Sequence, residues 1–137
     1  MTYRFPSSEW IGELSRLLNE SESYEQSAKD WEGDFIFVVG VDDVQEKEAY
    51  LFLGLKHGKS TGAALLGSLD ERPAEYRITA PYGVWRQVID GELDPIQGMM
   101  MRKLKLDGNL MKIMRYPKAA KEIVTCCASV PTEWPGG

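Results

Sequence analysis

The stretch Trp85-Arg-Gln-Val-Ile-Asp-Gly-Glu-Leu-Asp-Pro95, continued by Met99-Met-Met-Arg-Lys-Leu-Lys-Leu-Asp-Gly-Asn109, carries a dense set of helix and turn signals. Asp90-Gly91 is typical of a helix end, because glycine adopts the positive φ that often follows the last turn. Asp94-Pro95 is typical of a helix start, since aspartate caps free N–H groups and proline fits the first turn. Lys103-Leu104-Lys105-Leu106 alternates as an edge strand does. This stretch predicts two helices followed by a strand.

The rest of the chain shows the same kinds of pattern on either side of this stretch. Apolar residues at helical spacing and runs of β-branched or aromatic residues predict the remaining elements. These are a helix with an apolar stripe from Trp10 to Leu18, a short helix from Tyr24 to Asp30, strands over 34–39, 49–56, 60–66 and 75–79, a helix opened by Pro81, a Met-rich helix from Leu110 to Tyr116, and a last helix from Pro117 that ends before Pro131. Both faces of the strands are apolar, so we expect both to be covered. No linker divides the chain, which predicts one α+β domain over residues 1–137.

Composition excludes several classes of protein. The chain has 137 residues, of which 43% are hydrophobic and 27% charged, as in an ordinary globular domain. A net charge of −5 does not favour nucleic-acid binding, which needs a basic surface. No apolar run approaches the roughly 18 residues of a transmembrane helix, and the first residues lack the pattern of a signal peptide. A cytoplasmic location is therefore expected.

Three motifs that suggest chemistry also have ordinary structural explanations. Gly54-Leu-Lys-His-Gly-Lys-Ser60 resembles a phosphate-binding loop, but three residues instead of four separate its first glycine from Gly-Lys-Ser. Its predicted place is a hairpin whose tip is His57, the only histidine, which we interpret as a solvated turn residue. Cys126 and Cys127 are adjacent and cannot bridge without strain, so they fit small apolar helix positions. We predict no catalytic residue, no metal site and no cofactor.

Methionine is unusually concentrated near the motif that opens this section. Met99, Met100, Met101, Met111 and Met114 lie within sixteen positions. Flexible, polarizable methionine side chains can fill an irregular core or line a site for varied apolar ligands. Their spacing alone does not separate these two interpretations.

The residues from Trp85 to Asn109 resemble the sterol carrier protein type 2 family. The family motif there is Asp-Gly, Asp/Asn-Pro a few residues on, a Met-rich helix, and Gly-Lys-Leu-Lys-hydrophobic-x-Gly-Asp/Asn. The chain departs from it at Arg102, where glycine is usual, and at Asn109, where aspartate is common. The resemblance implies a five-stranded, mostly antiparallel sheet covered by helices, with an apolar tunnel between sheet and helices. It implies no cofactor and no catalytic residue.

The function that this resemblance implies is non-catalytic binding, with or without transfer, of a fatty acid, fatty acyl-CoA, sterol or phospholipid. The expected lipid-binding residues are those that cluster around the motif: Val84, Trp85, Val88, Met99, Met100, Leu104, Leu106, Leu110, Met111 and Met114. Two other functions stay open. One is a dimeric accessory protein, such as a homodimer, whose apolar surface binds a partner chain. The other is a minor enzyme of acyl-thioester metabolism.

Charge is divided unevenly along the chain. Residues 1–94 contain 9 basic and 18 acidic residues, whereas residues 95–137 contain 7 basic and 3 acidic residues. Basic residues interleaved with apolar ones are typical of proteins that rest on an anionic bilayer. We therefore expect Lys112, Arg115 and Lys118 to contact a membrane surface transiently.

Overall fold

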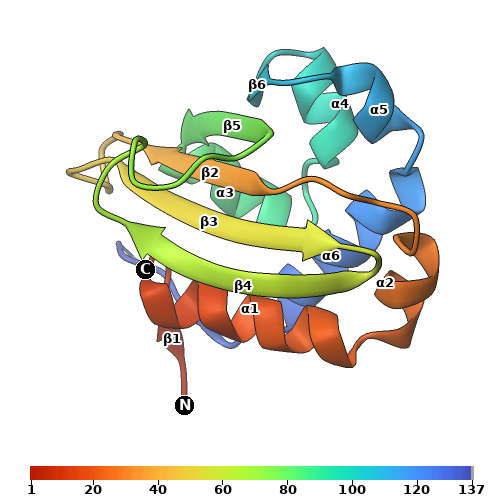
Figure 1. The fold of residues 1–137 in the computed structure, drawn as a ribbon. Coiled ribbons are helices and arrows are strands. Elements are labelled where there is room, and N and C mark those ends of the chain that lie inside the picture. The colour runs from red at the N-terminus through yellow and green to blue at the C-terminus, as the bar shows by residue number, and fades with distance from the viewer. Residues whose placement is uncertain (137) are drawn as a thin grey trace.

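The computed structural model describes residues 1–136, and its centre is a five-stranded sheet (Figure 1). The strands are β2 (Phe35–Gly40), β3 (Ala49–Lys56), β4 (Lys59–Leu66), β5 (Tyr76–Pro81) and β6 (Lys105–Asp107), in the order β4-β3-β2-β5-β6. Neighbouring strands run antiparallel except β2 and β5, which run parallel. The expected α+β fold with a five-stranded, mostly antiparallel sheet is confirmed.

Strands β3 and β4 form a tight hairpin. Its two turn residues, His57 and Gly58, both have positive φ, at 50° and 79°, as hairpin turns of type I′ require. The chain continues from this turn directly into β4 and not into a helix. The segment Gly54–Ser60 therefore has a hairpin geometry, and its backbone does not wrap around a phosphate. The exposed His57 ring lies 2.7 Å from the Glu32 carboxylate.

Six helices surround the sheet within the described residues. They are α1 (Ser8–Glu20), α2 (Glu22–Ser27), α3 (Tyr82–Ile89), α4 (Pro95–Met100), α5 (Leu110–Met114) and α6 (Pro117–Ser129). Side-chain oxygens cap four of them, from Ser7, Ser21, Asp94 and Asn109. Helix α1 packs along β4 and β3, α3 packs on β2 and β5, and α6 contacts α1, α2 and α3. The main core lies between these helices and one face of the sheet.

A loop covers the opposite face of the sheet. Ile36, Val38, Phe52 and Leu66 form a smaller buried cluster there. Residues 67–75 fold over it and bring the Arg72 guanidinium 4.0 Å from the centre of the Phe52 ring. The apolar pattern on both faces is thus explained by burial under the chain's own loop.

Two short features differ from the sequence-based expectation. Strands β1 (Tyr3–Arg4) and β7 (Thr132–Glu133) form a two-residue parallel pair, which is too short to produce a recognisable strand pattern. Strand β6 begins at Lys105 and not at Lys103, because the Lys103 and Leu104 N–H groups both donate to the Gly98 carbonyl at the end of α4. Leu104 is consequently buried in the core.

Arg102 has an unfavourable backbone conformation at this helix end. Its φ of 63° lies in the left-handed region, in the position where the resembled family motif has glycine. The conformation lets the chain turn, so that the Lys103 N–H reaches the Gly98 carbonyl at 2.9 Å. For a residue with a Cβ, this conformation costs about 1–2 kcal/mol.

The substitution Arg102→Gly is therefore expected to stabilise the fold. Relief of the steric cost is partly offset by the larger backbone entropy of glycine in the unfolded chain, about 0.5–1 kcal/mol. The net gain should be about 0.5–1 kcal/mol in the free energy of unfolding, measured by urea denaturation with an unchanged slope. The neighbouring change Lys103→Gly, where φ is not positive, should give no gain. If Arg102→Gly and Lys103→Gly lowered the free energy of unfolding by the same amount, this explanation would be contradicted.

Candidate functional site

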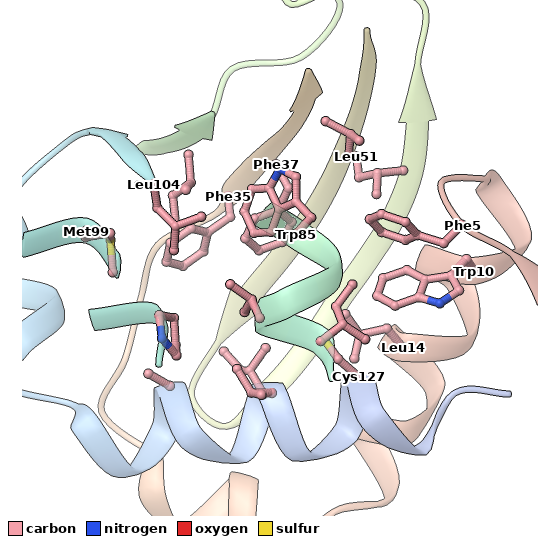
Figure 2. Close-up of a pocket in the computed structure, with 18 of the residues that line it drawn as sticks. Phe5, Trp10, Leu14, Phe35, Phe37, Leu51, Trp85, Met99, Leu104 and Cys127 are labelled. Atoms are coloured by element: carbon pink, nitrogen blue, oxygen red, sulfur yellow. The ribbon is translucent and has the colours of Figure 1, made fainter. Parts of the chain in front are cut away.

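A cavity of about 100 Å³ lies between the sheet and the helices, and Figure 2 shows the side chains that line it. Its wall is apolar throughout and is built from five parts of the chain. The N-terminal segment contributes Phe5, Trp10 and Leu14, and the sheet contributes Phe35, Phe37, Val39, Leu51 and Ile78. Helix α3 contributes Trp85, Val88 and Ile89, and the α4 region contributes Pro95, Met99 and Leu104. Helices α5 and α6 contribute Ile113, Ala120, Ile123, Val124 and Cys127.

The few polar atoms in this wall are turned away from the cavity or buried. The indole N–H of Trp85 donates to the Val38 carbonyl at 2.9 Å, and that of Trp10 donates to the Thr132 hydroxyl at 3.0 Å. Burial raises the pKa of the Cys127 thiol, which keeps it neutral and unreactive. The cavity therefore offers contact to hydrocarbon and no group that could activate a bond.

Four of the residues expected to bind lipid line this cavity. Trp85 and Val88 lie on the inward face of α3, Met99 lies on the inward face of α4, and Leu104 follows that helix. All four are buried and line the same cavity, and their contact with a lipid stays a prediction.

The other six expected residues lie outside the cavity wall. Val84, Leu106 and Leu110 are partly buried against the main core. Met100, Met111 and Met114 point to solvent, with exposed fractions of 59%, 66% and 38%, and Met101 is 56% exposed. The reason is helix phase: consecutive methionines at the end of α4 point in different directions, so Met99 is buried while its neighbours are not. Contact of these six with a bound lipid stays a prediction.

Most of the cavity wall comes from segments that the motif did not indicate. A signal for them exists in the sequence. Phe35, Phe37 and Val39 alternate along one strand, and Trp10 and Leu14 share one face of α1. The C-terminal helix contributes Ala120, Ile123, Val124 and Cys127, which recur at helical spacing. These patterns identify buried faces but do not distinguish a cavity wall from a filled core.

A second, smaller pocket of about 40 Å³ shares part of its lining with the first. Four side chains line both spaces: Phe35, Ile113, Ala120 and Ile123. On its far side the smaller space is bounded by Tyr24, Trp31, Leu55, Tyr116 and Ala119. Movement of the four shared side chains would join the two spaces into one channel under α6.

The sequence predicts that Lys112 contacts a membrane surface, and the structure places its ammonium group in contacts within the protein. Its ammonium group donates to the Glu32 carbonyl at 2.6 Å, lies 3.2 Å from the Glu75 carboxylate, and sits 4.8 Å from the centre of the Trp31 ring. These contacts attach α5 to the segment before β2 and to the start of β5. Arg115 and Lys118, in contrast, are exposed.

The chain offers no sign of a metal or a membrane-spanning helix in the part that the structure describes. Over residues 1–136, His, Cys, Asp and Glu side chains form no group of three that could hold a metal ion. In the same range, no helix has the length and hydropathy needed to cross a bilayer.

The chain thus has an α+β fold with an apolar space between its sheet and its helices. Residues 13–121 match the SCP-2 sterol transfer family, and the chain belongs to this family. The SCP2 domain is generally a non-catalytic lipid-binding domain.

Solved structures agree with this assignment. A crystal structure of sterol carrier protein 2 is 31% identical with a TM-score of 0.81, and the match covers 90% of this chain and 97% of that one. The solution structure of TT1886 from Thermus thermophilus, described as possibly a sterol carrier protein, is 31% identical with a TM-score of 0.84 and coverages of 93% and 90%. Palmitated SCP2L2 from Aedes aegypti shares the fold, at 14% identity, a TM-score of 0.56 and coverages of 85% and 95%. The curated proteins give no significant match.

The contacts of Lys112 lead to a stability prediction. Lys112→Met keeps an apolar side chain beside Trp31 but removes the ammonium contacts to Glu32 and Glu75. Because the Lys112–Glu75 ion pair is partly exposed and screened by solvent, the free energy of unfolding should fall by about 1 kcal/mol. Lys118→Met, at an exposed position on α6, should change it by less than about 0.5 kcal/mol. Equal effects of the two changes in chemical denaturation would show that the Lys112 contacts do not stabilise the fold.

Proposed function

We propose that this protein binds the hydrocarbon part of a lipid, a long acyl chain or a sterol, between its sheet and helices without altering it chemically. The observation that supports this proposal is the cavity whose nineteen lining residues present an apolar surface. Membership of the SCP-2 sterol transfer family and the palmitated state of one structural relative support the same proposal. The absence of a polar anchor in the wall, which lies wholly within residues 1–136, fits a ligand recognised by its hydrocarbon and not by its headgroup.

The ligand channel in this proposal follows the two spaces. Phe5 and Trp10 line the larger space, and Trp31 and Tyr116 line the smaller one. Only side chains separate them, and these include Ala120, whose small volume makes it the weakest part of the partition. An extended acyl chain would thus lie under α6, along the sheet.

Binding in this way requires the cavity to expand. Ligand pockets measure about 300–1,000 Å³, whereas the larger space here measures about 100 Å³. An empty apolar cavity of about 300 Å³ would cost about 7 kcal/mol at about 24 cal/mol per Å³. That cost is comparable to the whole stability of a domain, about 5–15 kcal/mol. The empty protein is therefore expected to hold its cavity partly collapsed and to open it as the ligand enters.

The energy of hydrocarbon burial is sufficient for useful affinity. Each buried CH₂ contributes about 0.8 kcal/mol, so a sixteen-carbon chain contributes roughly 12 kcal/mol in total. The loss of translational freedom and the ordering of the chain on binding cost about 4–15 kcal/mol. At the low end of that cost about 8 kcal/mol remains, which corresponds to an affinity around micromolar, at which a carrier can both load and release its ligand.

The decisive experiment blocks the partition between the two spaces. Ala120→Phe places a ring where both spaces meet, and should weaken the binding of a fluorescent fatty acid by at least tenfold. Because the ring fills empty volume, the melting temperature should fall by no more than a few degrees. The matched control is Ala128→Phe, which puts the same side chain on the exposed face of the same helix and should leave binding unchanged.

Two results would contradict the proposal. One is fatty-acid affinity in Ala120→Phe equal to that of the parent protein. The other is chemical change of the ligand: palmitoyl-CoA incubated with the protein should be recovered with its thioester intact, as shown by mass spectrometry. Native mass spectrometry of the protein as purified should also show bound species with the masses of lipids.

A further inference from the structure

The outer surfaces of α4 and α5 carry an unusual group of exposed apolar side chains. We call Met100, Met101, Met111 and Met114 the methionine patch. Each is between 38% and 66% exposed, although burial of such side chains is ordinarily favourable. The two helices and β6 form one corner of the molecule, beside the sheet edge (Figure 1). The inner surfaces of the same two helices line the cavity with Met99 and Ile113, so this wall is one helix thick.

Basic side chains follow the methionines of the patch in the sequence. We call Arg102, Lys103, Arg115 and Lys118 the basic rim; all four are exposed. Within residues 1–136, none of them has a carboxylate at ion-pair distance, whereas Lys112 between them is paired internally. Arg102 also keeps a cationic side chain at a backbone position that favours glycine. Backbone strain of this kind gathers at functional surfaces.

The charge of the remaining surface has the opposite sign. Residues 1–94 contain twice as many acidic as basic residues. Near a negatively charged surface this body is repelled while the basic rim is attracted, so the molecule would turn the α4–α5 corner toward that surface. The methionine patch lies on the same corner, and the unbranched, flexible side chain of methionine adapts to a fluid hydrocarbon layer.

From these observations we infer that the methionine patch and its basic rim dock on an anionic phospholipid bilayer. The rim contacts lipid phosphates and carboxylates, while the methionines enter the boundary between headgroups and acyl chains. Docking here sets the thin α4–α5 wall of the cavity against the source of the ligand. The docking itself can be measured without a bound ligand, and only its purpose rests on the proposed lipid binding.

The test is co-sedimentation of the full chain with vesicles of phosphatidylcholine alone or of equal parts phosphatidylcholine and phosphatidylserine. The protein should sediment only with the second kind, and binding should weaken as the Debye length falls from about 10 Å at 0.1 M salt to about 3 Å at 1 M. The rim variant K103Q/R115Q/K118Q should bind at least tenfold more weakly. The patch variant M101S/M111S should show a loss of similar size.

Matched controls change the same chemistry elsewhere on the surface. K29Q/K47Q/K56Q removes three exposed lysine charges outside the rim, and V41S/L65S replaces two exposed apolar side chains outside the patch. Both should bind within twofold of the parent protein. If the charge control lost as much affinity as the rim variant, only net charge would matter, and the proposed docking surface would be wrong.

Other outcomes separate this inference from the proposed function. Equal binding to both kinds of vesicle, or to neither, overturns the docking surface. Self-association in sedimentation velocity that M101S/M111S abolishes would identify a second copy of the chain as the occupant of the patch, which also overturns it. Fatty-acid affinity measured without vesicles tests the cavity alone: if it persists while docking fails, lipid binding stands and only the docking surface falls.

Discussion

The parallel pairing of β2 with β5 is the constraint on which the other features of this structure depend. Two parallel strands end at the same edge of a sheet, so the segments that follow them meet there. The Asp42 carboxylate, just after β2, accepts hydrogen bonds from the Val44 and Gln45 N–H groups and from the Gly83 N–H at the start of α3. Those backbone hydrogen bonds hold the pKa of Asp42 below its ordinary value. The pairing thereby determines where α3 begins.

Helix α3 in turn determines the shape of the space above the sheet. The parallel register places Phe35 beside Tyr76 and Phe37 beside Ile78, so one face of both strands is continuously apolar. Trp85 lies across this face, 5.5 Å from Phe37 between ring centres, and is fixed by its hydrogen bond to Val38. With α1 on one side and α3 on the other, α6 closes the remaining gap without filling it. The cavity is the volume left by three helices that meet above a twisted sheet.

Much of this arrangement could be predicted from the sequence, because it depends on local patterns. The run of β-branched and aromatic residues over 34–39, the turn at His57-Gly58 and the cap at Asp94 each act over a few residues, and the structure has the expected elements there. The direction of individual methionines could not be predicted. Helices α4 and α5 have only six and five residues, too few for a pattern to define a buried face. The pairing of Lys112 with Glu75 was equally hidden, since 37 positions separate them and only the completed fold brings them together.

A ligand bound in the apolar cavity would also affect the turnover of the protein in a cell. A ligand that binds only the folded state adds RT ln(1 + [L]/Kd) to its stability, about 2.7 kcal/mol when the free ligand is at 100 times its Kd. Proteases act on the transiently unfolded fraction, so a change of this size alters abundance several-fold. On the proposed function, an unloaded carrier is degraded faster than a loaded one. The amount of carrier then follows the supply of lipid, with no separate regulator, because the ligand stabilises only the folded state.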